Sequence, residues 1–201
     1  VKNSLSNITF SNINITSSTA GTYMGLIGNT AAEIENITFN EIVINAAKKS
    51  YVACIANSTS DKINNIKLTN INVKGSSYVA SFITYTNEKP ITNITADNVN
   101  VVASGNYAGG IIGYAPWTDY RKQQEIKYLT VSNSNIKGGT YVGGVLGYGR
   151  VNYMESNDNQ ITGNTYVGGV SGYAYYNNGN STTTNGVIKG SASYIGGIAG
   201  Y

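Results

Sequence analysis

Histidine is absent from the 201 residues, and cysteine occurs once, at Cys54. The missing imidazole excludes histidine-based catalytic triads and histidine-ligated zinc, and a single thiol excludes an internal disulfide. Charged residues form only 11% of the chain, and the net charge of +3 includes no basic run, so we expect no binding to nucleic acid. No apolar run approaches the roughly 20 residues of a membrane span, so we expect no direct membrane insertion.

The chain is rich instead in glycine (24 residues), tyrosine (17 residues) and β-branched side chains, which favour strands and turns over helices. A tyrosine followed by a short apolar, glycine-rich phrase occurs seven times, at intervals of 25 to 34 residues. A period of this length indicates one supersecondary unit stacked on copies of itself. The phrases begin at Tyr23, Tyr51, Tyr78, Tyr107, Tyr141, Tyr166 and Tyr194.

A second pattern precedes each phrase, with apolar residues at offsets 0, 3, 5, 8 and 10, as in 34–44. This spacing predicts two short strands with one inward face, joined by a polar bend, and the tyrosine phrase supplies a third short strand. We therefore predict an all-β fold, a right-handed parallel β-helix (β-solenoid) of about seven coils of roughly 28 residues. We expect residues 1–201 to form a single solenoid segment that is cut from a longer chain or stacked end to end.

Equivalent residues of successive coils are expected to stack into ladders. Asparagine suits a tight bend, and stacked amides can hydrogen-bond to one another. Ala53-Cys54 and Ala80-Ser81 occupy the paired-glycine positions of coils two and three, which indicates that small size matters there more than positive φ. The tyrosine ladder contains Tyr51, Tyr78, Tyr107, Tyr141, Tyr166 and Tyr194, and the asparagine ladder contains Asn7, Asn36, Asn65 and Asn93, after which the bend position changes to Tyr128 and Tyr153.

Two long connections, 115–125 and 174–185, leave the coil at the same corner and are predicted to project on one side. Loops gathered on one edge of a repeat protein often form its binding face. Their aromatic and guanidinium groups suit a host glycan or protein, although the same rings can simply pack over the solenoid. The candidate binding residues are Trp117, Tyr120, Arg121, Tyr175 and Tyr176.

The ten carboxylates are scattered along the chain, with no repeated pair at the spacing of a glycosidase site. Asp119 with Glu125 is the only pair that we consider. The aspartate pattern of calcium-binding nonapeptide repeats is missing. We therefore predict no enzyme activity, no catalytic residue, no cofactor and no bound metal.

The phrase Tyr141-Val-Gly-Gly-Val-Leu-Gly-Tyr148 and its relatives resemble the GLUG motif of bacterial surface proteins, found in the non-catalytic N-terminal part of IgA-specific metallo-endopeptidases. The resemblance implies an extracellular location on a bacterial cell surface. No catalytic residue of those proteases has a counterpart here.

We expect a non-catalytic structural stalk that presents adhesive or enzymatic regions. The alternatives are a self-assembling extracellular fibre subunit joined end to end, a glycan- or protein-binding adhesin module and, least favoured, a polysaccharide lyase or hydrolase.

Overall fold

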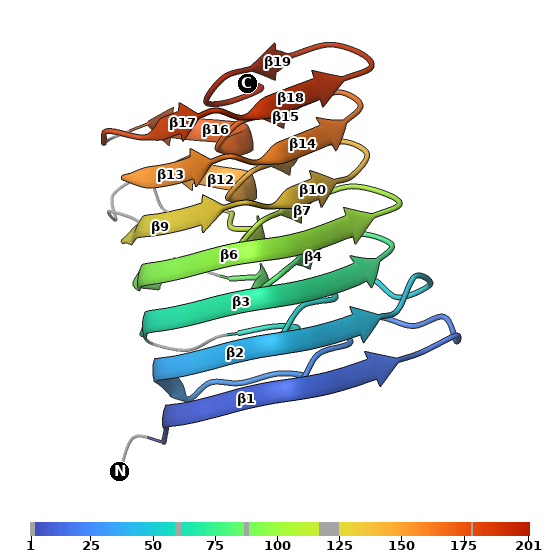
Figure 1. Cartoon of the computed structure of the whole chain (residues 1–201), viewed down its shortest axis with the longest axis vertical. Coiled ribbons are helices and arrows are strands. Elements are labelled where there is room, and N and C mark those ends of the chain that lie inside the picture. The colour runs from blue at the N-terminus through green and yellow to red at the C-terminus, as the bar shows by residue number, and fades with distance from the viewer. Residues whose placement is uncertain (1–2, 59–61, 87–88, 117–124, 178) are drawn as a thin grey trace.

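The computed structural model describes residues 3–58, 62–86, 89–116, 125–177 and 179–201, and within them it contains strands and no helix. Every pairing between these strands is parallel, for example β1 (Ser4–Thr16) with β2 (Glu33–Asn45). Figure 1 shows the strands stacked one above another from the N-terminal to the C-terminal end. The predicted parallel β-solenoid is confirmed.

A broad sheet forms the near wall in Figure 1 and has seven levels, numbered here from the N-terminal end. Each of the first four levels is one 13-residue strand, whereas each of the last three is divided in two. The remaining strands of this sheet are β3 (Ile63–Gly75), β6 (Ile91–Ala103), β9 (Ile126–Ser132) and β10 (Asn135–Lys137) at level five, β13 (Met154–Asn157) and β14 (Gln160–Gly163) at level six, and β17 (Thr182–Thr184) and β18 (Val187–Gly190) at level seven.

Two narrower sheets complete the coil, and the tyrosine phrases build both of them. Each phrase was predicted to give one strand, but the four phrases that begin at Tyr78, Tyr107, Tyr141 and Tyr166 turn in the middle and give two strands each. One sheet contains β4 (Val79–Ala80), β7 (Ala108–Gly109), β11 (Val142–Gly143), β15 (Val167–Gly168) and β19 (Ile195–Gly196), and the other contains β5 (Ile83–Tyr85), β8 (Ile112–Tyr114), β12 (Leu146–Val151) and β16 (Ser171–Asn177).

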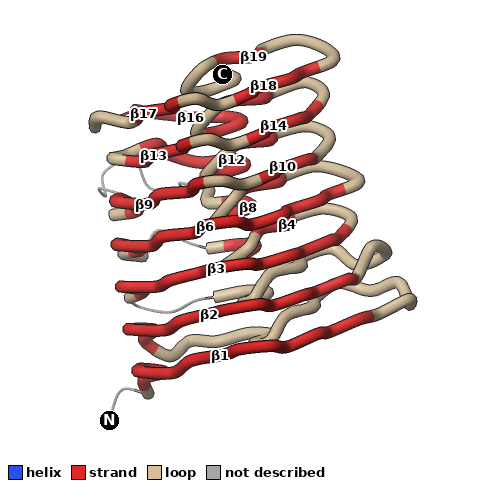
Figure 2. Tube along the Cα trace, in the orientation of Figure 1, coloured by secondary structure: helices blue, strands red, loops and turns tan. Residues whose placement is uncertain are grey.

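The coil is right-handed. In Figure 1 the strands of the near wall run from left to right, and the chain returns behind them while it rises toward its C-terminal end. The tube in Figure 2 follows the same path, with loops and turns joining the near wall to the strands behind it. This is the hand that parallel crossover connections almost always take.

The polar bends of the broad sheet are single residues with positive φ. Asn36 has a φ of 57° and Glu41 has a φ of 54°, and the pairing of β2 with β3 skips both residues. Asparagine tolerates this left-handed conformation better than most side chains. At levels one to four each strand continues through the bends. The two predicted short strands are therefore one strand whose pairing with its neighbours is interrupted at the bend residues.

The paired glycines allow two close approaches of the backbone. A Cβ on Gly143 would lie closer than 3.0 Å to the carbonyl oxygen of Leu146, which explains the turn inside the phrase. A Cβ on Gly144 would meet the carbonyl oxygen of Gly169 on the next level at a similarly forbidden distance. Neither glycine has φ in the left-handed region, so small size is the requirement, as the sequence predicts.

The core consists of columns of aliphatic side chains that point inward from all three sheets. Phe39 is fully buried, with its ring stacked on Phe10 at 5.2 Å between centroids and tilted against Phe82 at 6.0 Å. Cys54 is also fully buried, and burial raises the pKa of its thiol, so it acts as a small core residue.

Candidate functional site

The predicted loop site falls largely on residues that the structure leaves undescribed. Trp117, Tyr120, Arg121 and the acidic candidate Asp119 all lie outside the described residues, and Tyr176 lies in β16 with its side chain outside them.

Tyr175 is described, and its hydroxyl donates a hydrogen bond to the hydroxyl of Tyr148. Its ring packs edge-on against Tyr148 and Tyr173, at 4.9 and 5.5 Å between centroids. Burial raises the pKa of its hydroxyl, and the hydrogen bond with Tyr148 adds to this rise. A binding role for the predicted loop site stays a prediction.

The tyrosines of the predicted ladder, from Tyr51 to Tyr194, stack continuously, and the tilted ring of Tyr23 extends the column to a seventh level. Its ring centroids lie 5.0, 4.4, 4.6, 4.9, 4.9 and 4.9 Å apart from level one to level seven. Most of these tyrosines have positive φ, such as 61° at Tyr107, a backbone cost of about 1–3 kcal/mol per residue that stacking offsets in part. The ring faces inside the stack cover one another, so this wall presents ring edges and hydroxyls.

A second tyrosine column, formed by the last residue of the phrases, was not predicted. The rings of Tyr114 and Tyr148 stack at 4.9 Å, and Tyr114 meets Tyr107 of the first column edge-on at 4.9 Å. Burial, followed by neighbouring tyrosines, raises the pKa of Tyr107 to about 12. The signal was present in the sequence, because a tyrosine recurs seven residues after the opening tyrosine of each of the last five phrases.

The predicted asparagine ladder forms between the first three levels. The Nδ2 of Asn36 donates to Oδ1 of Asn7 at 3.2 Å, and Nδ2 of Asn65 donates to Oδ1 of Asn36 at 2.7 Å. At the fourth level Asn93 donates instead to Asn64, the residue preceding Asn65, at 2.8 Å. The ladder therefore shifts by one residue there.

Levels five and six replace an inward aliphatic column with a buried polar cluster. The column that contains Ile42, Ile71 and Val99 continues as Ser134 and Asn159, which are 5% and 1% exposed. The break between β9 and β10 falls at Ser134, and the break between β13 and β14 falls at Asn159.

Side chains at these breaks satisfy backbone groups. Ser134 Oγ accepts a hydrogen bond from the Val99 amide at 2.9 Å. Asn159 Oδ1 accepts from the Ser134 amide at 2.8 Å, and its Nδ2 donates to the Val131 carbonyl at 2.9 Å. The cluster therefore holds both strand breaks in a fixed shape.

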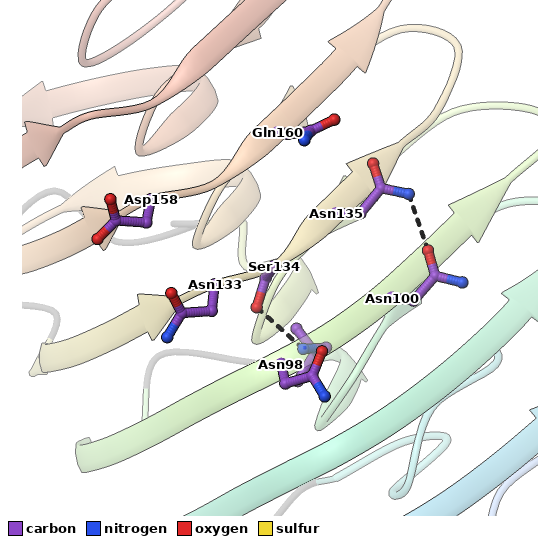
Figure 3. Close-up of a pocket in the computed structure, with 8 residues that line it drawn as sticks. Asn98, Asn100, Asn133, Ser134, Asn135, Asp158 and Gln160 are labelled. Carbon is purple, nitrogen blue, oxygen red and sulfur yellow. Dashed lines mark hydrogen bonds between the residues drawn. The ribbon is translucent and has the colours of Figure 1, made fainter.

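A shallow polar groove of about 440 Å³ lies on the outer face over these breaks. Figure 3 shows Asn133 and Asp158 projecting from successive levels at the strand breaks, with Asn100, Asn135 and Gln160 along the neighbouring strands. Asn135 Nδ2 donates to Asn100 Oδ1 at 2.9 Å, which leaves Asn135 Oδ1 as an acceptor at the end of that amide ladder. The groove can therefore receive hydrogen bonds from a hydroxylated ligand.

A second hollow of about 370 Å³ lies beside the first corner of the same levels. Its walls include Tyr128 and Tyr153, which are 50% and 44% exposed and whose rings stack at 5.4 Å with a tilt of 30°. Thr130 Oγ1 lies 3.5 Å from a carboxylate oxygen of Glu155 in the same hollow.

The described residues contain no group of three or more histidine, cysteine, aspartate or glutamate side chains arranged to hold a metal ion. In the same part of the chain we find no helix with the length and apolar character that a membrane-spanning helix needs.

Comparisons with protein-family models, with curated proteins and with solved structures found no match to this chain. The functional argument therefore depends on the chain's own geometry.

Proposed function

We propose that this chain is a non-catalytic, extracellular structural stalk that holds adhesive or enzymatic regions away from a bacterial surface. The observation that carries this proposal is the continuity of its ladders along one axis. The backbone hydrogen bonds of all three sheets and the tyrosine stack run from level to level in the same direction. Such a stack resists bending and extension at each level through many parallel contacts.

The surface chemistry and the repeated phrases support the location. The GLUG-like phrases are typical of bacterial surface proteins, and the outer face is made mainly of asparagine, serine and threonine with few charges. The test is labelling of intact cells of the source bacterium with an antibody raised against residues 1–201. We expect labelling before permeabilisation, with an antibody to a cytoplasmic protein as the control for intact cells. Labelling only after permeabilisation would refute the extracellular role.

A fibre subunit is the second candidate, because the outermost levels of the described chain expose apolar side chains that inner levels bury. Ile195 at level seven is 43% exposed, whereas the equivalent Val167 at level six is fully buried. At level one Tyr23 is 52% exposed. Open strand edges of this kind favour end-to-end association. Light scattering after size-exclusion chromatography at rising protein concentration tests the fibre. A molecular mass that stays at 21.3 kDa would contradict it.

A further inference from the structure

Levels five and six depart from the repeat at two positions of the broad sheet. At the first corner, the asparagine of levels one to four is replaced by Tyr128 and Tyr153, although φ remains positive at 60° and 48°. At the second, aliphatic core residues are replaced by Ser134 and Asn159. Residues that disagree with their local conformation are expected mainly at functional sites. Two such departures at the same levels therefore point to a site there.

The aromatic pair is displayed rather than packed into the core. Asparagine adopts a positive φ more readily than tyrosine. At levels five and six this corner nevertheless carries Tyr128 and Tyr153, which are about half exposed. The rings are tilted by 30° to one another, and the hollow that they line is also lined by Glu155, Asn180 and Thr182. The result is an apolar platform bordered by hydroxyl, amide and carboxylate groups.

The two hollows are neighbours on the same sheet face. Thr130 lines the aromatic hollow and Asn133 lines the amide groove, and they are three residues apart on one level, or about 10 Å at the rise of a strand. Between them Ser132 and its level-six partner Asn157 are partly exposed, while Val131 points into the core. A continuous polar strip therefore joins the aromatic platform to the groove of Figure 3.

The chemistry of the strip favours a neutral, polyhydroxylated ligand. Amides and hydroxyls both donate and accept hydrogen bonds, which matches sugar hydroxyl groups. Glu155 and Asp158 disfavour an anionic glycan by like-charge repulsion. An organic cation is disfavoured in turn, because the Lys127 ammonium already lies 5.6 Å from the centroid of the Tyr128 ring.

We propose that the outer face of levels five and six is a binding track for a neutral oligosaccharide. Tyr128 and Tyr153 pack against the apolar face of one sugar unit, and Glu155 accepts hydrogen bonds from its hydroxyls. The groups of the amide groove, among them Asn135 and Gln160, bind the hydroxyls of the units that follow. This activity does not depend on the stalk role, since it uses residues that break the repeat.

Calorimetric titration of the 201-residue chain tests the track with cellohexaose, xylohexaose, mannohexaose and N-acetylchitohexaose, and with choline as the cationic probe. We expect at least one neutral hexasaccharide to bind. The double variant Tyr128→Asn, Tyr153→Asn restores the residue of the lower levels, so it should fold and lose at least about tenfold in affinity. The matched control Tyr194→Asn removes an equally exposed tyrosine from another wall and should leave the affinity unchanged.

Length dependence tests the second half of the track. Gln160→Ala, a change at an exposed position, should weaken the hexasaccharide by roughly threefold, since one hydrogen bond is lost, and leave the matching disaccharide unaffected. Equal affinity for both lengths, with no effect of Gln160→Ala, would overturn the extended track. Binding of choline alone, binding of no neutral probe, or full affinity in the double tyrosine variant would overturn the proposal as a whole.

Discussion

Replacing Gly144 with alanine separates size from backbone conformation as the reason for the paired glycines. A Cβ there would lie closer than 3.0 Å to the carbonyl oxygen of Gly169 and to Oγ of Ser156. The carbonyl belongs to the backbone of the next level, so the new methyl group must push two levels apart. Overpacking of a core typically costs about 1–3 kcal/mol of folding free energy. Because the backbone has to move here, we expect Gly144→Ala to lower the free energy of unfolding by about 3 kcal/mol.

Gly197 provides the matched control, because it is the equivalent glycine at level seven and a Cβ there has nothing within 4 Å. Glycine to alanine at a compatible position stabilises by about 0.4–1 kcal/mol through the unfolded state. Urea unfolding followed by circular dichroism should therefore show opposite signs for Gly144→Ala and Gly197→Ala. Equal effects of the two variants would refute the argument that close packing between levels selects glycine.

Three further predictions concern single side chains. Asn65→Ala should lower the free energy of unfolding in urea by about 1–3 kcal/mol, because alanine disfavours a φ of 54° and the side-chain hydrogen bond to Asn36 is lost. Asn65→Gly should cost less, because glycine adopts positive φ without strain. The pKa of Tyr107 is raised to about 12, so stability should be constant below the unfolded-state pKa of about 10 and fall as the pH rises toward 12; a urea midpoint that increases over this range contradicts it. The buried thiol of Cys54 should resist iodoacetamide in the native chain and react in urea, as mass spectrometry would show.

Much of the fold could be predicted because each coil repeats the same physical constraints. The period, the inward apolar positions and the small residues of the phrases define a parallel β-solenoid without long-range information. The turn inside the phrase was missed, since the close approach of Gly143 to the Leu146 carbonyl depends on three-dimensional geometry. The continuation of the strand through Asn36 was missed for a related reason, because one residue with positive φ interrupts pairing without ending the strand.

The candidate site was harder to predict than the fold. The change from asparagine to Tyr128 and Tyr153 was visible in the sequence, but its position beside a hollow was not. The role of Asn159 depends on hydrogen bonds to backbone groups of two different levels, Ser134 and Val131, which no local pattern specifies. Trp117 was predicted to bind a ligand because its loop is rich in aromatic residues, and it lies outside the described residues.

The most direct test of the central claim, that a binding site lies where the repeat is broken, is amide chemical-shift mapping of the 15N-labelled chain during titration with the four hexasaccharides. We expect shifts confined to the outer face of levels five and six, around Tyr128, Asn133 and Tyr153, with the tyrosine ladder of the narrow sheets unchanged. Shifts centred on that ladder, or no shifts with any of the four sugars, would contradict the claim.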